Sequence, residues 1–566
     1  MDGIVESRSN SENGTKLSNR TPENVSPAIR LAPEGAPSLA STEIYPPIRD
    51  AILILCALTM TIFLVSLDRL IIATAIPKIT DEFHSIADIG WYASAFMLTG
   101  SSFMLLFGKI CTFYSPKWVL MTAISLFEIG SAICGAAPNS TAFIIGRAVA
   151  GLGFSGIFIG GTVTIQRILP LHMRPMAMGL MGAIFGISSV AGPLIGGALT
   201  TNVSWRWCFY INLPFGGLAM FVLALFLKAT APVKASTTFK SQVAQLDPLG
   251  TICFLPSIIC LLLALQWGGS TYPWSNPRII VLFIVFAILL TLFITIQILK
   301  KEPEHATVPT HVFQQRSITA GFLFSFCVGG SMVLMIYFLA IYFQAIRGVD
   351  ALHSGLNMLP FLLSIAAFAM IAGFAVSKLG YYVPFLILGP VLVAVGAGLI
   401  TTFSAETSKG KWIGYQILCG IGYGIGAQQT NVAAQTVLKQ KDIAIGSALM
   451  MFAAQISGAV FVPIGNAVFE NEFLKKLNGI PGVNGKLVLN TGATEIRNVV
   501  SPNVLDAVLR AYDGALTKVF LVAAIMAAIA LLPALCMEWK SVKKDLVKKG
   551  NGKGADVESA PVVEKA

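Results

Sequence analysis

The sequence predicts an all-α membrane protein that crosses the bilayer many times. Of its 566 residues, 55% are hydrophobic and only 12% are charged, and the mean hydropathy is +0.75, far from the balance of a soluble domain. Apolar stretches of about 20 residues, each long enough to cross about 30 Å of hydrocarbon, recur between short polar loops. A membrane β-barrel would instead show alternating segments of about 10 residues, so the unbroken apolar runs exclude it.

Fourteen apolar segments are predicted to span the membrane. They are residues 50–76, 90–109, 117–136, 141–165, 176–199, 205–227, 247–266, 278–299, 317–343, 355–376, 383–403, 411–435, 443–469 and 516–537. An even number of spans places both termini on one side. Lys and Arg are about twice as frequent in the short loops on that side, and such loops stay in the cytosol, so both termini are expected to be cytosolic.

Weak internal sequence similarity indicates how the chain is divided. The segment before the fifth span, residues 174–179, is echoed before the thirteenth, at residues 442–446, as in transporters built from repeated bundles. A long extracellular loop is expected at about residues 470–515. The predicted division is a disordered cytosolic tail at residues 1–47, an N-terminal six-helix bundle at 48–228, cytosolic linkers with two inserted helices at 229–310, a C-terminal six-helix bundle at 311–540 and a basic cytosolic tail at 541–566.

The net charge of +11 does not indicate a nucleic-acid partner, because Lys and Arg are spread through loops and the C-terminal tail beside a membrane helix. Anionic lipid headgroups are the expected partner of these charges. The nine cysteines are interpreted as buried free thiols. The five histidines show no metal-ligand spacing, so no metal and no other cofactor is expected. Asn139 and Asn202 begin glycosylation sequons in very short outer loops.

Four stretches carry a resemblance to a known family. They are Leu67-Asp68-Arg69 through Ala75-Ile76-Pro77, GRAVAGLG at residues 146–153, AGPLIGG at 191–197 and WRWCFYINLP at 205–214. Between residues 50 and 540 the chain resembles the major facilitator superfamily, specifically the fourteen-span drug:proton antiporter branch found in fungi. It departs from the family in the loop after the second span, where Thr112 stands in place of the usual Asp.

The resemblance implies the major facilitator fold, with two six-helix bundles plus two additional central transmembrane helices. It also implies proton-coupled export of a small amphipathic compound, such as a fungal secondary metabolite, a mycotoxin or a drug, by alternating access. Multidrug resistance is a common consequence of such efflux pumps. The plasma membrane is the expected location, with the vacuolar membrane as the alternative. Protons, a small-molecule substrate and the lipid bilayer are the expected partners, and the oligomeric state is left open, a monomer being compatible with the family.

Few ionisable side chains lie inside the spans, where a central charge costs at least about 3 kcal/mol on insertion scales. Asp68 and Arg147 fall at comparable depth on the first and fourth spans, which line the central cavity in the resembled fold. We predict that they form a protonation-sensitive pair, with a permanent ion pair as the alternative. Glu128, on the third span, is interpreted as a structural hydrogen-bonding residue, with proton transfer as the second hypothesis. Arg69 is expected to face polar neighbours or the membrane interface.

The fifth span is rich in glycine, which lets helix backbones approach closely. In the resembled family the stretch containing Gly192, Pro193, Gly196 and Gly197 marks antiporters and lies between the two halves, where close sliding contact would permit rocking. Ordinary small-residue packing is the alternative. Gly179, Gly182 and Gly186 precede this stretch on the same span.

Uncharged hydrogen-bonding residues gather on the twelfth span, which suits a cavity wall rather than a lipid-facing helix. Together with residues of the second and ninth spans they could bind an amphipathic molecule, although each aromatic residue alone is more typical of packing or of the interfacial belt. The candidates for the substrate cavity are Trp91, Phe96, Tyr337, Tyr342, Gln344, Tyr423, Gln428, Gln429 and Asn431.

Proton-motive force is the expected energy source, because the sequence contains no Gly-x-x-x-x-Gly-Lys-Ser/Thr loop for nucleotide. An enzyme is not expected, because the spans carry no Ser-His, paired-Asp or His-cluster arrangement. Import or facilitated diffusion of a nutrient or siderophore on the same fold, and a membrane sensor without transport, are the alternatives.

Overall fold

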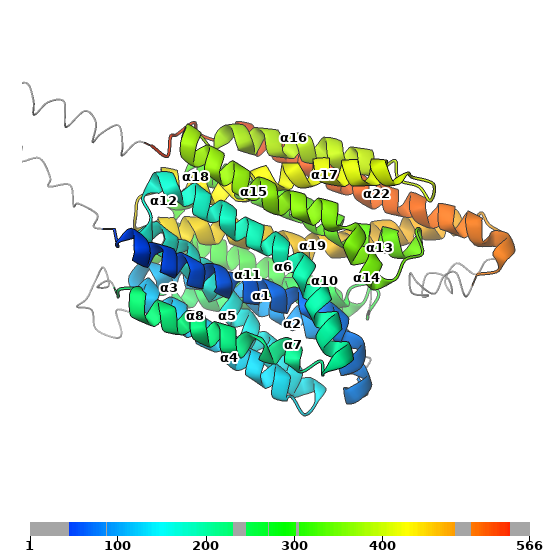
Figure 1. Ribbon diagram of the computed structural model, residues 1–566, viewed down its shortest axis with the longest axis horizontal. Coiled ribbons are helices and arrows are strands. Elements are labelled where there is room, and N and C mark those ends of the chain that lie inside the picture. Colours follow the sequence, from blue (N-terminus) through cyan, green and yellow to red (C-terminus); the bar gives the residue numbers. More distant parts are fainter. Residues whose placement is uncertain are drawn as a thin grey trace, which may run out of the picture. The chain divides into compact units, whose positions relative to one another are not determined.

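The computed structural model describes residues 45–85, 88–229, 245–269, 271–300, 305–481 and 500–543. Almost all of these residues are helical (Figure 1). The predicted tails at residues 1–47 and 541–566 lie almost entirely outside the described residues, as does much of the linker between the sixth and seventh predicted spans.

The first part of the chain forms helices that we call the N-terminal half. Their starts follow local sequence signals: the Asn139 side chain accepts a hydrogen bond from the backbone N–H of Ala142 at 2.9 Å, and Pro116 and Pro175 occupy first turns, where a missing N–H costs nothing. The helices are α1 (Ile48–Phe83), α2 (Ile89–Ser102), α3 (Met104–Phe113), α4 (Pro116–Ala136), α5 (Ser140–Ile168), α6 (Arg174–Asn202), α7 (Trp207–Tyr210) and α8 (Asn212–Phe226), with a 3-10 turn η2 (Leu171–Met173) before α6.

Two helices follow that match the predicted insertion, α10 (Pro248–Trp267) and α11 (Pro277–Leu299). They pack against each other, and α10 also contacts α2 and α19. Only 11% of the α11 span is buried, so nearly all of this very apolar helix is available to lipid.

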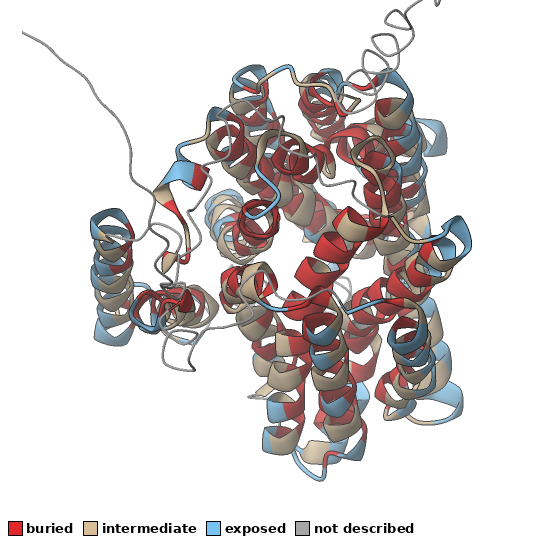
Figure 2. Cartoon of the chain, turned by 90° about the vertical axis from the view of Figure 1, so that its left-hand side faces the viewer, coloured by how far each residue is buried: buried red, intermediate tan, exposed pale blue. Residues whose placement is uncertain are grey.

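The rest of the described chain forms what we call the C-terminal half. Its helices are α12 (Thr310–Phe313), α13 (Arg316–Ala345), α14 (Ala351–Asn357), α15 (Leu359–Leu379), α16 (Val383–Ile400), α17 (Lys409–Gly426), α18 (Gln429–Val437), α19 (Ile443–Leu477) and α22 (Pro502–Leu535). Figure 1 shows α15, α16 and α22 on one side of the described helices and α4 and α8 on the opposite side, with α1, α6 and α19 between them. Figure 2 shows buried residues on the helix faces that meet and exposed residues on the outer faces.

Thirteen helices among the described residues are long and apolar enough to cross a membrane. The predicted span at residues 411–435 is divided into α17 and α18 and is not among the thirteen, so the count of fourteen stays a prediction. Around the predicted outer loop, α19 continues to Leu477 and α22 begins at Pro502. Both helices therefore extend into the segment that the sequence assigned to the loop.

The two halves meet most closely where glycine removes the side chain. A methyl group at Gly179 of α6 would overlap the carbonyl oxygen of Ala369 on α15, and one at Gly108 of α3 would lie 2.5 Å from the Cβ of Ala448 on α19. Gly108 and Ala448 lie in the last turns of α3 and the first turns of α19, and Pro175 at the beginning of α6 likewise lies against Gly373 toward the end of α15. Because successive spans run in opposite directions, all four positions lie on the side where α1 begins. The halves are therefore in contact on that side of the protein.

Candidate functional site

Asp68 of α1 and Arg147 of α5 form a buried ion pair. Their Oδ2 and Nη1 atoms are 2.6 Å apart, and the side chains are 0% and 1% exposed. Arg147 Nε also donates to the backbone carbonyl of Tyr92 at 3.0 Å. Asn212 Nδ2 donates to Asp68 Oδ1 at 3.3 Å and to Ser131 Oγ at 3.0 Å. Side chains and backbone from five helices thus surround the pair that sequence analysis had placed on two spans, and supply the partners that buried charges require.

Two aromatic rings complete the surroundings of Arg147. Its guanidinium lies 4.6 Å from the ring centre of Phe96 and 5.7 Å from that of Phe209. Both distances lie within the range of cation–π attraction. Both rings are fully buried, so the pair and its hydrogen-bond partners form a polar cluster inside an apolar core.

Glu128 of α4 does not make the structural hydrogen bond predicted for it. The residue is buried, and neither carboxyl oxygen has a hydrogen-bond partner among the described residues. Gly216 of α8 provides the space, because a methyl group there would overlap Glu128 Oε1. Glu128 also interacts electrostatically with Asp68. A desolvated carboxyl without a donor is costly to charge, which the sequence position alone could not reveal.

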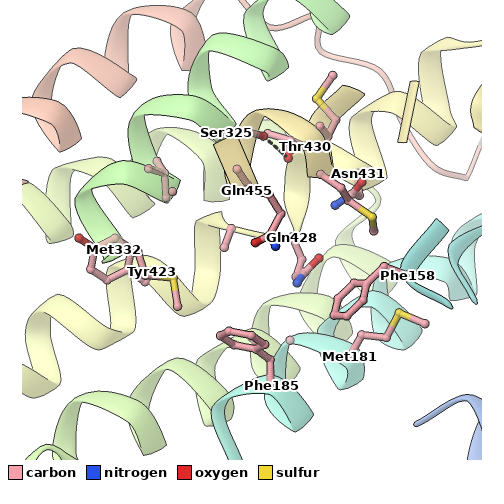
Figure 3. Close-up of a pocket in the computed structure, with 18 of the residues that line it drawn as sticks. Phe158, Met181, Phe185, Ser325, Met332, Tyr423, Gln428, Thr430, Asn431 and Gln455 are labelled. Carbon is pink, nitrogen blue, oxygen red and sulfur yellow. Dashed lines mark hydrogen bonds between the residues drawn. The ribbon is translucent and has the colours of Figure 1, made fainter. Parts of the chain in front are cut away.

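A cavity of about 180 Å³ lies between the two halves (Figure 3). The N-terminal half contributes mainly rings and thioethers, from Phe154, Phe158, Phe185, Met104 and Met181. The C-terminal half contributes most of the amides and hydroxyls, from Ser325, Tyr423, Gln428, Thr430, Asn431 and Gln455. Figure 3 shows Phe158, Met181 and Phe185 across the cavity from Gln428 and Gln455. The amides and hydroxyls of the cavity therefore come from the C-terminal half, which also contributes apolar side chains such as Phe324, Met332 and Met451.

The break between α17 and α18 places polar groups at the cavity. Gln428 lies at the break, and Asn431 follows one turn later on α18. Thr430 accepts a hydrogen bond from Ser325 at 3.0 Å. In contrast, Asn431 Oδ1 and Gln455 Nε2 are buried without a hydrogen-bond partner among the described residues. Buried polar atoms normally have partners, so these two atoms indicate where a ligand could bind.

Among the cavity residues that the sequence did not predict, Arg69 is the charged one; as expected, it faces a polar neighbour. It lines the cavity from α1, its Nη1 donates to Gln455 Oε1 on α19 at 3.2 Å, and its guanidinium lies 6.0 Å from the ring centre of Phe185. The signal was its position after Asp68, since adjacent helix residues point about 100° apart. A helix that turns Asp68 toward Arg147 necessarily turns Arg69 elsewhere.

Of the predicted cavity residues, Tyr423, Gln428 and Asn431 line the cavity. The structure places the others outside its lining, namely Trp91, Phe96, Tyr337, Tyr342, Gln344 and Gln429. Trp91 packs against Trp267 of α10, Tyr337 is 45% exposed, and the Tyr342 hydroxyl donates to the carbonyl of Ser404 at 2.8 Å. The reason is helix rotation: a residue on a cavity-lining helix can still face lipid or a neighbouring helix.

The predicted antiporter stretch of α6 packs inside the N-terminal half rather than between the halves. A methyl group at Gly192 would lie 2.9 Å from the Cβ of Leu70, and one at Gly196 would overlap Thr74, both on α1, while Gly197 has open space. Helix α6 continues through Pro193. The contact between the halves is instead made earlier on the same helix, by Gly179, Gly182 and Gly186.

The structure also describes the predicted glycosylation sites, the cysteines and the residues that could bind a metal. Both sequon asparagines are exposed; Asn139 caps α5, and Asn202 Nδ2 donates to the carbonyl of Ala198 at 3.0 Å. All nine cysteines are free thiols, but Cys56 and Cys536 are exposed rather than buried. Within the described ranges, His, Cys, Asp and Glu form no cluster of three or more that could hold a metal ion.

Apolar helices of membrane length, packed as two groups around a partly polar cavity, are the architecture of a polytopic membrane transporter. Residues 58–462 match the family described as the Major Facilitator Superfamily. The chain belongs to this superfamily.

Several fungal proteins are similar along most of their length. The chain is 51% identical over 492 residues to an MFS-type efflux pump, MFS1, of Arthroderma benhamiae, covering 87% of this chain and 91% of that protein. It is 47% identical to the efflux pump aflT of Aspergillus parasiticus, covering 87% and 96%, and 47% identical to the rubrofusarin-specific efflux pump aurT of Gibberella zeae, covering 86% and 88%. The proton:xylose symporter XylE has the same fold, with a TM-score of 0.56 at 14% identity, covering 86% and 95%.

Proposed function

We propose that the protein exports small amphipathic compounds of the fungal secondary-metabolite or drug type, by alternating access and in exchange for protons. The cavity between the halves carries this proposal. It combines apolar and aromatic walls with a few polar anchors, as binding sites for small organic molecules do, and it lies at the interface where transporters of this type bind substrate. The names of the fungal relatives support export as the direction.

The conformational part of the proposal rests on where the halves touch. They are in contact on the side where α1 begins, at α6 with α15 and at α3 with α19. With cytosolic termini, this contact closes the cytosolic side. A transport cycle would separate these contacts and form others on the opposite side, at the plasma membrane or, as the alternative, the vacuolar membrane.

The proton-coupling part rests on the buried pair. Protonation of Asp68 would remove the charge that holds Arg147 and would weaken the bond from Asn212. Glu128 of α4 is a second carboxyl that interacts electrostatically with Asp68, and it has no hydrogen-bond partner among the described residues. Asp68 is adjacent to Arg69, which lines the cavity, so a change at the pair is transmitted to the cavity through a single turn of α1.

The test compares export by purified protein in sealed vesicles under an imposed pH gradient. Asp68→Asn should abolish gradient-driven export. Removing one member of a buried pair also costs about 3–5 kcal/mol of stability, so the double variant Asp68→Asn, Arg147→Gln is needed to separate folding from coupling.

We expect the double variant to recover thermal stability but not proton-driven export. Asp350→Asn is the control, because Asp350 is exposed and pairs with His353 at the surface. Undiminished proton-dependent export by the stable double variant would remove the pair from the mechanism. Wild-type vesicles that move no compound and no protons would overturn the proposed function itself.

A further inference from the structure

The residues that line the cavity carry a positive charge without a balancing negative charge. Among the described residues that line it, Arg69 is the only one with a charged side chain at neutral pH, and no carboxylate is present to balance it. Its recorded hydrogen-bond acceptor is the neutral amide oxygen of Gln455, at 3.2 Å. The nearest acidic residue in sequence, Asp68, is turned toward Arg147 at 2.6 Å. Arg69 therefore faces the cavity without a counter-ion in the lining.

We propose that this cavity selects anionic aromatic compounds, whose carboxylate or phenolate binds Arg69. This inference rests on the proposed function and adds the substrate class. A guanidinium presents its donors in a planar fork that fits an acid group, and hydrogen bonds between two charged groups are stronger than those to a neutral amide. An anionic ligand would supply the charge that Gln455 cannot.

The surroundings of Arg69 provide for the aromatic part of such a ligand. Phe185 lies beside the guanidinium, with Phe154 and Phe158 on α5 and the thioethers of Met181 and Met451 along the cavity wall. Aromatic rings and polarisable thioethers favour flat aromatic groups. A flat ring lying along this wall would direct its acid group toward Arg69.

Binding of the acid would also change a contact between the halves. Arg69 is on α1 and Gln455 is on α19, so their hydrogen bond joins the two halves across the cavity. An acid group that replaces Gln455 as the acceptor releases this bond, and Gln455 Nε2, which lacks a partner among the described residues, remains available to donate to the ligand. The substrate would therefore loosen the contact that has to break when the halves move apart.

The test uses two ligands of the same shape. 2-Naphthoate is an anion at neutral pH, and 2-naphthamide is its uncharged counterpart. Equilibrium binding of each to the purified full-length protein is measured by dialysis for the wild type, Arg69→Gln and Arg69→Lys, with Arg347→Gln as the control at an arginine that bonds the backbone of Ala405, outside the cavity. We expect the wild type and the control to prefer 2-naphthoate by about tenfold, since one charged contact is worth about that factor.

Arg69→Gln should abolish the preference, and Arg69→Lys should retain part of it. This second variant keeps the charge, so it separates loss of charge from a folding defect. Equal binding of the two ligands by the wild type, or failure to bind 2-naphthoate, would overturn the inference. Neither result would contradict export, which fails only if the vesicles move no compound and no protons; an exporter that prefers neutral or cationic compounds would keep the proposed function and lose this substrate class.

Discussion

Asp68 and Arg69, which are adjacent on α1, lie in different environments. Asp68 points to Arg147 within the N-terminal half, whereas Arg69 points to the cavity and to Gln455 of the other half. In a helix this divergence follows from the turn of about 100° per residue. The consequence is that one turn of α1 carries both the candidate proton site and the candidate anion site, so their chemistry can be coupled without a long pathway.

Asp247, a further buried carboxylate, is the N-cap residue just before α10, outside the membrane-spanning helices, and can be tested through pH. It accepts hydrogen bonds from Gln297 Nε2 at 2.7 Å, Lys300 Nζ at 2.6 Å, Gly250 N at 2.9 Å and both N and Oγ1 of Thr307, at 3.0 and 2.9 Å. Burial acts to raise the pKa of Asp247, but these hydrogen bonds outweigh it and lower the pKa to about 2. The carboxylate thereby joins α10, the end of α11 and the segment that leads to α13.

Asp247→Asn should therefore destabilise the protein by about 2 kcal/mol at pH 7. Because the pKa is lower in the folded state, this stabilisation is present above the ordinary Asp value and is lost as the pH falls toward 2. The difference in thermal stability between wild type and variant should shrink by about half at pH 3. Glu406→Gln, at an exposed carboxyl, is the control. A pH-independent difference would show that packing, not charge, is responsible.

At the scale of elements, substitution by alanine is expected to have opposite effects on stability at two glycines of α6. Gly179→Ala would place a methyl group against the carbonyl oxygen of Ala369 on α15, where backbone cannot yield, whereas Gly197→Ala meets nothing within 4 Å. We expect Gly179→Ala to cost about 1–3 kcal/mol. Gly197→Ala should be neutral or stabilising by up to about 1 kcal/mol, because Ala favours helix. Thermal unfolding of the purified variants measures both, and equal effects would contradict the assigned interface between the halves.

The sequence predicts where the helices lie in the chain better than which side of each helix faces the cavity. Apolar length located the helices, and burial cost correctly selected Asp68 and Arg147 as partners. Where a helix is apolar all round, however, hydropathy carries no information on rotation, so Tyr342 was expected in the cavity although it faces Ser404. The break at Gln428 and the missing partner of Glu128 are likewise tertiary properties, because they depend on which neighbouring helix approaches.

At the scale of the whole molecule, the contact between α3 and α19 should control which side is closed. Gly108 permits this contact, and the next residue, Lys109, donates from Nζ to the carbonyl of Ala306 at 2.6 Å, in the segment that leads to the C-terminal half. Cys111 lies three residues after Gly108, on the same face of α3, and is 2% exposed. Its thiol can therefore report whether this side has opened.

Gly108→Leu should wedge α3 away from α19, because even a Cβ would lie 2.5 Å from that of Ala448. The variant should then populate the state in which this side is open, and maleimide labelling of Cys111, followed by peptide mass spectrometry, should accelerate by about tenfold or more. The exposed Cys536, just after the end of α22, serves as an internal reference. Gly217→Leu, at a position with open space, is the control for added bulk. If Cys111 stayed unreactive in a folded Gly108→Leu protein, the α3–α19 contact would be a fixed packing contact, and the separation of the halves would have to occur elsewhere.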